Sequence, residues 1–583
     1  MPLILKPQLT KVAEPWCLYS ESQNCGKKPQ WNAVGTARRF QDWSFPVFLM
    51  DNETEIELIR DACYKKFNKP GPKGKPPLYP LCAVTMRMFM LAAKDAVTCI
   101  RRGNLFDGIQ TGLSPLCGPI ADKNVYSLIP PSNKSEATQK MNKNSVMVVA
   151  TRMDSFTMMD KISPGAGSIT SVIILLVVAE ALGRNKTAFG QLQQDGLKHN
   201  RRILLTFFHG ESLDYIGSSR MVYDIENKKF PSELSDKKVN ESNLLLMENL
   251  GFFLEVGEVG WAEKAEYFAH VDGTVYKQKK SEIDKVINQI GALMNVKIAD
   301  SSSSAKLPPA SYQRFLKSQK ELPGILLADF KDSFKNKFYN SFAEEGFFIN
   351  KTDISAMVSV AQGVLNAITS WIQTSSQFKI NNDTVETFIK CLLKQKWSDC
   401  KLLQVIFNST DFDKGAPLFH TYTSPGNPIR SLVHALMFWL TGEELLSQTS
   451  RKSCLSQAKD DDIYDYGWLP PLDINNLNLT VNVTNVTKSC FRSLVHQKKA
   501  QSPAFEIEGY DLTKTEYSTW VESIWGGNRD EDSKLLQIFL VSDPWFDWMV
   551  LVVGILVTLS SVTVTYFCSQ NADAIFGPRP VAL

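Results

Sequence analysis

The alternation of apolar and polar positions predicts an α/β core in the middle of the chain. Residues 145–155, "SVMVVATRMDS", are apolar and β-branched, which is typical of a buried strand. A helical run follows at Ile169–Leu182, and a second strand ends at Phe208. This strand, helix, strand order is typical of parallel neighbours in an α/β sheet, whose functional residues lie just past the strand ends.

The C-terminal apolar pattern predicts a membrane span. Residues 548–568, "WMVLVVGILVTLSSVTVTYFC", carry no charge. At about 1.5 Å per residue, a helix of this length spans about 30 Å, the thickness of the hydrocarbon core. Aromatic residues flank it, as at membrane interfaces: Trp545, Phe546, Trp548, Tyr566 and Phe567. We predict a transmembrane helix at 546–568 and a cytosolic tail at 569–583.

Glycosylation signals set the orientation of this span. Ten N-x-[ST] sequons precede it and none follows, which favours a luminal ectodomain. The sequon asparagines are Asn52, Asn133, Asn185, Asn240, Asn350, Asn382, Asn408, Asn478, Asn482 and Asn485.

The net charge of +3 gives no sign of nucleic-acid binding, and the lysine-rich stretch from Lys65 has the prolines and glycines of a solvated loop.

The cysteines agree with a luminal location. Ten of the eleven precede the span, and an even number suits a disulfide framework. Zinc is the competing interpretation, but the chain contains no C-x2-C pair. Spacing favours the following pairs, although sequence alone leaves the connectivity open: Cys17 with Cys25, Cys63 with Cys82, Cys99 with Cys117, Cys391 with Cys400 and Cys454 with Cys490.

Changes in composition and in the pattern of apolar residues divide the chain into segments. We expect a cysteine-rich, partial N-terminal small lobe at 1–123, with a strand-like segment at 43–51 and a helical one at 81–97. A large lobe with an extension follows at 124–540. The first ten residues, "MPLILKPQLT", lack the features of a signal peptide. Since a glycosylated single-span protein needs an export signal, we expect an incomplete or alternative N-terminus.

Three motifs in the predicted core carry a resemblance to the di-zinc aminopeptidase fold: "ATRMDS" from Ala150, "PGAGS" from Pro164 and "FFHGESLDYIGSS" from Phe207. In that family a histidine, a bridging aspartate and a Glu-Glu pair bind zinc, and the first glutamate is the general base. The resemblance implies a mixed sheet with helices on both faces. It places Arg152, Ser168 and Ser212 at three ligand positions, and it matches Asp154, Glu211 and Glu255 to retained acidic residues.

These replacements predict a site without metal, cofactor or catalysis. A guanidinium stays protonated and repels zinc. General-base catalysis by Glu211 alone would accelerate hydrolysis by about 10² to 10⁴, whereas the Lewis acid and the activated water are lost with the metal. The remaining activity on a peptide bond is expected to be negligible. A serine-hydrolase site is disfavoured because "GESLD" fails the G-x-S-x-G pattern at its last position. His209, with no such serine to activate, is interpreted as a packed, hydrogen-bonded structural residue.

A longer match is more specific. The segments "GESLDYIGSSRMVYD" from Gly210 and "TEYSTWVESIW" from Thr515, with the single C-terminal span, closely resemble the nicastrin family of γ-secretase glycoprotein subunits. The resemblance implies a catalytically inactive, receptor-like subunit that partners presenilin and two small multispanning membrane subunits and helps select type I membrane-protein stubs. It also implies residence in the endoplasmic reticulum, Golgi, plasma membrane and endosomes. The expected substrate-pocket residues are Glu211, Tyr215, Asp214, Arg152 and Asp154.

Two other functions stay open on the sequence, a degenerate zinc ectopeptidase and a plain adhesion or receptor ectodomain. The role of Glu211 also has two versions. A buried carboxylate needs hydrogen bonds or a cation, and Arg152 is the expected internal partner. Alternatively, Glu211 captures the free α-amino group of a substrate, as aminopeptidases do.

Overall fold

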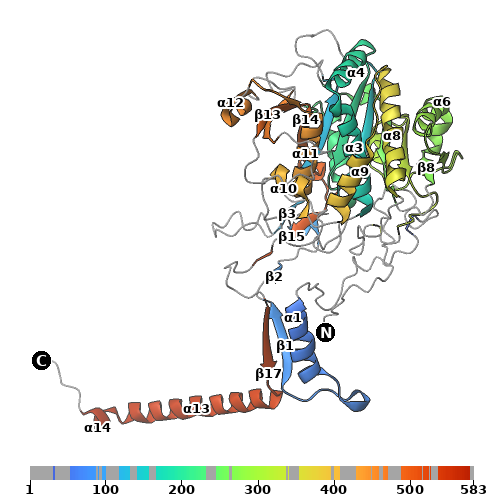
Figure 1. Cartoon of the computed structure of the whole chain (residues 1–583). Coiled ribbons are helices and arrows are strands. Elements are labelled where there is room, and N and C mark those ends of the chain that lie inside the picture. Colours follow the sequence, from blue (N-terminus) through green and yellow to red (C-terminus); the bar gives the residue numbers. More distant parts are fainter. Residues whose placement is uncertain are drawn as a thin grey trace. The chain divides into compact units, whose positions relative to one another are not determined.

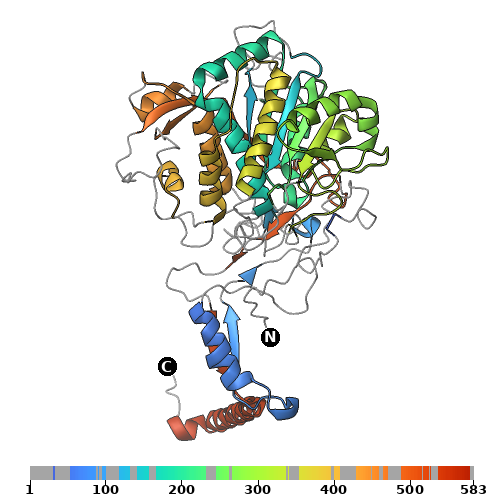
Figure 2. The same cartoon turned by 45° about the vertical axis from the view of Figure 1, so that its right-hand side comes forward.

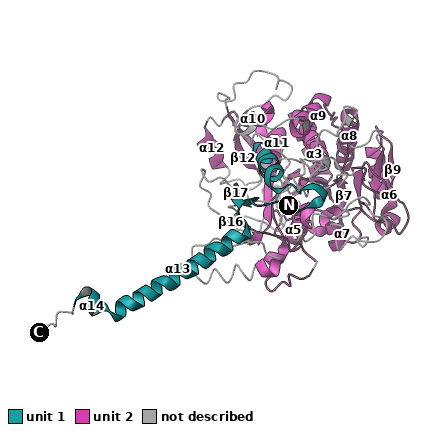
Figure 3. Ribbon diagram, turned by 90° about the horizontal axis from the view of Figure 1, so that it is seen from below, with its two compact units in different colours: residues 1–6, 43–92, 523–583 teal, residues 7–42, 93–522 magenta. Residues whose placement is uncertain are grey.

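The computed structural model describes nineteen segments of the chain. They are residues 31–32, 53–86, 89–90, 95–99, 117–131, 141–155, 166–231, 244–260, 266–336, 339, 353–394, 399–407, 428–447, 450–457, 464–470, 488–514, 516–523, 525–526 and 536–577. Two compact units emerge, a small one of residues 1–6, 43–92 and 523–583 and a large one of residues 7–42 and 93–522 (Figure 3).

An eight-stranded mixed sheet forms the centre of the large unit, in the order β14-β4-β6-β5-β7-β10-β8-β9 (Figure 1). Strands β5, β6, β7 and β10 are parallel neighbours, while β4, β14 and β8 join antiparallel. The bounds are β4 Ala121–Ile129, β5 Val146–Arg152, β6 Arg202–Phe208, β7 Leu250–Val256, β8 Tyr267–His270, β9 Val296–Ile298, β10 Gly324–Ala328 and β14 Val495–Gln501. The predicted α/β class and the parallel pairing across the first helix are confirmed.

Helices cover both faces of this sheet (Figure 2). The alternation along β5 shows why, because Met147 and Val149 point into one core while Val146, Val148 and Ala150 point into the other. The first core contains α3 Ala166–Arg184, α4 Lys186–Lys198, α6 Gly273–Ile290, α8 Asp353–Ile372, α9 Asn382–Ile389, α10 Lys401–Phe407 and α11 Pro428–Thr441. The second contains α5 Ile216–Glu226 and α7 Tyr312–Ser318.

The first helix of the predicted core, α3, is the central one. Its residues from Ile169 to Leu182 are buried, so it is apolar on every face, and Glu180 forms an ion pair with Arg184 near its end. The large unit also has a three-stranded sheet of β11 Glu443–Glu444, β13 Ser489–Ser493 and β12 Asp465–Leu469, next to α12 Arg451–Ser456. A two-stranded pair joins β3 Cys117–Pro119 to β15 Val521–Ser523.

The small unit combines both ends of the chain. Helices α1 Glu53–Glu57 and η2 Leu58–Asn68 and the short turn η3 Pro72–Gly74 precede β1 Leu81–Met86, which pairs antiparallel with β17 Leu536–Val541. A second pair joins β2 Phe89–Met90 to β16 Trp525–Gly526. The expectation of a helix at 81–97 is therefore wrong for residues 81–86 and 89–90, because pairing with β17 and β16 overrides the helical pattern. The expected strand at 43–51 lies outside the described residues.

The C-terminal helix α13 Pro544–Gln570 is long and apolar enough to cross a membrane, and it contains the predicted span. The Asp543 side chain caps its first turn by accepting from the Trp545 N–H at 3.0 Å. A short helix, α14 Ala572–Phe576, follows. Among the described residues, α13 is the one helix that meets the length and composition of a membrane span.

Candidate functional site

The candidate site is built on a sharp reversal after β6. The chain leaves the strand through Gly210 (φ 79°), forms a 3-10 turn at Glu211–Leu213, and passes through Asp214 (φ 75°) and Tyr215 (φ 54°) before α5 begins. Aspartate tolerates the left-handed region, but a bulky residue such as Tyr215 does so at a cost of about 1–2 kcal/mol. The Tyr215 N–H donates to the carbonyl of Glu211 at 3.2 Å, so the strained turn is held by its own backbone.

Asp154 fastens this turn to the end of β5. One of its carboxylate oxygens accepts the Glu211 N–H at 2.9 Å, and the other accepts the Ser212 N–H at 2.9 Å and the Ser212 hydroxyl. Free N–H groups at the start of a turn favour a negative side chain. Asp154 therefore acts here as a structural cap, and Ser212, at a ligand position of the aminopeptidase pattern, completes that cap.

Glu211 is buried, with 1% of its surface exposed. Its Oε1 accepts the Ser218 N–H at 2.8 Å, and its Oε2 accepts the Ser218 hydroxyl at 2.7 Å and the Ser311 hydroxyl at 2.6 Å. Burial raises the pKa of Glu211 to about 8, although these hydrogen bonds act in the opposite direction. The carboxyl group is therefore mostly protonated at neutral pH.

A second buried carboxyl, Glu255 of β7, shares a partner with the first. Its two oxygens accept the N–H groups of Ser311 at 3.0 Å and Tyr312 at 2.9 Å. Burial raises the pKa of Glu255 to about 7. Ser311 thus donates its N–H to Glu255 and its hydroxyl to Glu211. We call these three residues the Glu-Ser-Glu cluster.

Arg152 ends β5, and its guanidinium lies 4.9 Å from the centre of the Tyr339 ring. Its positive charge lowers the pKa of Glu255 against the effect of burial. The expectation that Arg152 would be the partner of Glu211 is therefore corrected. The donors to Glu211 are serine groups, and the arginine charge acts on Glu255.

Tyr215 and Asp214 differ in exposure. Tyr215 is 3% exposed, burial raises its pKa well above the usual range, and the Arg314 guanidinium lies 5.9 Å from its ring centre. Asp214 is half-buried, and its N–H donates to the carbonyl of Glu211. Their membership in a substrate pocket stays a prediction.

The helix that supplies Ser218 has a fixed position on the sheet. A Cβ at Gly217 would lie 2.4 Å from the Asn124 side-chain oxygen and 2.6 Å from the His209 carbonyl, so only glycine fits. Asn124, on β4, donates to the Gly217 carbonyl at 2.9 Å and accepts the His209 N–H at 3.0 Å. Sequence reasoning missed Asn124 and Ser311, which lie outside the recognised motifs.

His209 lies beneath this turn and is fully buried. Burial lowers its pKa, which makes the ring neutral at physiological pH. Its Nδ1 lies 3.5 Å from Asp122, whose other oxygen accepts from Arg430 at 3.1 Å. His209 is therefore packed, as the sequence suggests, but the expected hydrogen bonding is wrong, because neither ring nitrogen has a hydrogen-bond partner among the described residues.

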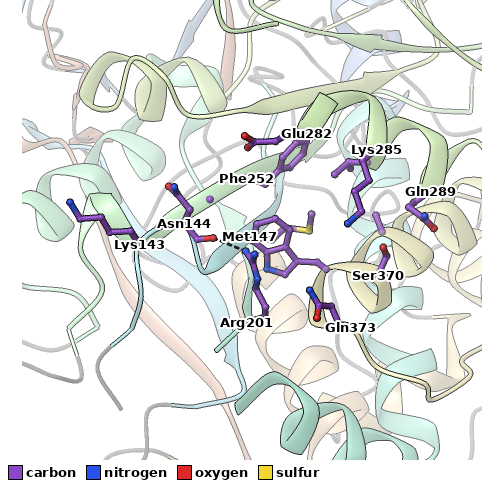
Figure 4. Close-up of a pocket in the computed structure, with 14 residues that line it drawn as sticks. Lys143, Asn144, Met147, Arg201, Phe252, Glu282, Lys285, Gln289, Ser370 and Gln373 are labelled. Atoms are coloured by element: carbon purple, nitrogen blue, oxygen red, sulfur yellow. Dashed lines mark hydrogen bonds between the residues drawn. The ribbon is translucent and has the colours of Figure 1, made fainter. Parts of the chain in front are cut away.

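A separate pocket of about 340 Å³ lies at the amino ends of β5 and β7 (Figure 4). Glu211 instead follows the carboxyl end of β6, which runs parallel to β5. The Arg201 guanidinium lies 4.6 Å from the Trp371 ring centre and donates to the Asn144 carbonyl at 2.7 Å. The lining also includes Lys143, Met147, Phe252, Glu282 and Lys285. None of the residues expected in the site lines this pocket.

The Glu211 region does not fit a zinc ion. All the carboxyl oxygens of Asp154, Glu211 and Glu255 accept hydrogen bonds from the protein, and Arg152 brings a positive charge to the same site. Within the described segments, no three His, Cys, Asp or Glu side chains form a ligand group. The side chain of Ser168 lies outside the described residues.

Covalent features of the ectodomain are partly described. Disulfides join Cys63 to Cys82, Cys391 to Cys400 and Cys454 to Cys490, with Cα–Cα distances of 5.4, 5.2 and 5.5 Å. Cys99 is also disulfide-bonded, and the Cys117 side chain lies outside the described residues. Asn185 and Asn382 are exposed at helix starts, and the other eight sequon asparagines fall outside the described segments.

Fold and site together define a single-span membrane protein whose large α/β unit holds two hydrogen-bonded, buried carboxyl groups. A family model described as the nicastrin large lobe matches residues 145–375, and one described as the nicastrin small lobe matches residues 11–92. Nicastrin of Mus musculus is 30% identical over 588 residues, covering 95% of this chain and 77% of the relative. Nicastrin of Caenorhabditis elegans is 28% identical, covering 93% and 76%.

A solved structure gives the same result for the fold. The crystal structure of the γ-secretase component nicastrin matches with a TM-score of 0.62 at 18% identity, covering 91% of this chain and 84% of that chain. The chain belongs to the nicastrin family.

Proposed function

We propose that this chain is the non-catalytic glycoprotein subunit of a γ-secretase complex, in which it supports assembly and substrate selection. Membership of the nicastrin family along 95% of the chain is the observation that carries this function. The proposed partners are presenilin, two small multispanning membrane subunits and type I membrane-protein stubs as substrates. The proposed locations are the endoplasmic reticulum, Golgi, plasma membrane and endosomes.

The Glu211 region favours a non-catalytic role. A general base must reach a water molecule, whereas the carboxyl group of Glu211 is buried and both of its oxygens bind Ser218 or Ser311. Asp154 is likewise occupied by the backbone of the turn. We keep Glu211, Tyr215, Asp214, Arg152 and Asp154 as the proposed substrate-pocket residues. Asp154 also holds the turn after β6 by accepting from the N–H groups of Glu211 and Ser212.

Copurification tests the subunit assignment. The full chain, tagged at its C-terminus, is expressed in cells, extracted in a mild detergent and purified, and the bound membrane proteins are identified by mass spectrometry. Presenilin and the two small subunits are the expected partners. The matched control replaces residues 546–568 with a poly-leucine span, which keeps the anchor and removes the small and hydroxylated residues that allow close helix packing.

The purified protein then separates the subunit from the alternative of a zinc ectopeptidase. We expect less than one zinc ion per chain by elemental analysis and no release of an aminoacyl fluorophore. Stoichiometric zinc with hydrolysis that a chelator abolishes would favour the ectopeptidase. An ectodomain that copurifies with no membrane protein would favour a plain receptor.

A further inference from the structure

The small unit carries a basic loop that the proposed function does not use. We use this name for residues 65–79, "KKFNKPGPKGKPPLY", which comprise the last turn of η2 and the connection toward β1. They contain five lysines and no acidic residue, and all five lysines are exposed. Lys65 forms an ion pair with Asp61 at 2.6 Å. Among the residues that the structure describes, Lys69, Lys73 and Lys75 form no ion pair, so their charges face solvent.

Strand register places this basic loop at the membrane end of the small unit. In the antiparallel pair of β1 and β17, Leu81 lies opposite Val541. The chain enters β1 directly from the loop, and it enters α13 at Pro544, three residues after Val541. The end of the loop and the start of the membrane span therefore lie at the same end of the two-stranded sheet.

Two fixed contacts hold the base of the loop at this position. The Asn68 side chain donates to the Cys82 carbonyl at 2.7 Å and accepts the Cys82 N–H at 2.8 Å. The disulfide between Cys63 and Cys82 ties η2 to β1 at the same level. The two ends of the basic loop are therefore held together by hydrogen bonds and a disulfide.

The end of the basic loop is apolar. Leu78 is 87% exposed and Tyr79 is 42% exposed, directly before the strand. The first turns of α13 carry Trp545 and Trp548, which are also exposed. Tryptophan and tyrosine gather at the level of lipid headgroups, and apolar side chains beside several lysines are typical of segments that lie in that interface.

We propose that the basic loop docks on the membrane surface beside α13. Leu78 and Tyr79 enter the boundary between headgroups and acyl chains, and the ammonium groups of Lys69, Lys73 and Lys75 bind lipid phosphates. This second contact holds the small unit against the bilayer.

Depth-dependent quenching of a fluorescent label tests this docking in the full chain. In a Cys568→Ser background, Leu78→Cys is labelled with an environment-sensitive fluorophore and reconstituted in phosphatidylcholine nanodiscs with and without phosphatidylglycerol. The matched control is Leu58→Cys, which is 52% exposed on the same unit. It lies at the start of η2, ten residues before Asn68.

Docking predicts that a lipid-attached quencher quenches the label at position 78 and leaves the label at position 58 bright. Each of Lys73→Gln and Lys75→Gln is expected to lower the ratio of docked to undocked loop in anionic nanodiscs about five-fold. Equal quenching at both positions overturns the proposal. The proposal is also wrong if the label at position 78 is buried only when partner subunits copurify, because a protein and not the membrane then covers the loop. Quenching that ignores both lysine substitutions overturns the phosphate contacts.

Discussion

Glu211→Gln is expected to stabilise the protein at neutral pH. The native pKa of Glu211 is about 8, against an ordinary value of 4.5. Between these values the folded state holds a proton that the unfolded state releases, so the free energy of unfolding falls as pH rises, by about 1.4 kcal/mol per pH unit. The whole window corresponds to about 5 kcal/mol. The stability is fully present below pH 4.5 and is lost as pH rises toward 8.

Glutamine imitates the protonated acid without titrating. Its carbonyl oxygen accepts the Ser218 N–H, and its amide donates to the hydroxyl groups of Ser218 and Ser311, which rotate to accept. The variant therefore resembles the wild type near pH 5. At about pH 7.5 the wild type has lost roughly 3 to 4 kcal/mol through Glu211, and the variant has not.

Guanidinium denaturation of the full chain in detergent, followed by tryptophan fluorescence, measures this difference. With a denaturant slope of about 5 kcal/mol per molar, the midpoint of the variant should exceed that of the wild type by about 0.6 M at about pH 7.5, with coincident midpoints near pH 5. A variant less stable than the wild type at both pH values would refute the protonated state of Glu211.

Three further predictions concern the surrounding fold. Gly217→Ala should destabilise the large unit by about 3 kcal/mol or block maturation, because its Cβ would meet backbone and side-chain atoms within 2.8 Å. Gly190→Ala, whose Cβ would have nothing within 4 Å, should instead stabilise α4 by up to about 1 kcal/mol. Thermal melts and glycan maturation measure both effects. Replacing Cys454 and Cys490 together by alanine should cost about 4 kcal/mol, from a sequence separation of 36, as a lower denaturation midpoint. Asn382→Gln should remove one glycan, visible as a single step in gel mobility that enzymatic deglycosylation abolishes.

The central layer of the fold could be predicted from local pattern. The strand at 145–155, the helix at 169–182 and the strand that ends at Phe208 all depend on short apolar runs bounded by turns. Residues 81–86 could not be predicted in this way, because their strand partner lies more than 400 residues later in the sequence. Where pairing is that remote, an apolar stretch with helical spacing gives no sign of the tertiary contact that decides its structure.

The candidate site shows the same division. Glu211 and Asp154 belong to sequence motifs, so their closeness could be expected, and Asp154 does bind the Glu211 backbone. The groups that donate hydrogen bonds to the carboxyl group of Glu211 could not be predicted from the sequence. Arg152 was the apparent partner because charge is visible in a sequence, whereas a serine hydroxyl such as that of Ser311 has no distinctive pattern.

Protonation and hydrogen bonds from serine residues together explain how three acidic side chains can be buried in this site. Carboxylates this close repel one another and lose hydration, which disfavours the charged state. Here Asp154 is compensated by N–H and hydroxyl donors, while Glu211 and Glu255 reach pKa values of about 8 and 7. The groups come from the ends of β5 and β6, from β7 and from the residue before α7. The bonds of Glu211 to Ser218 and Ser311 connect these elements, so a structural role is sufficient to account for this buried carboxyl group.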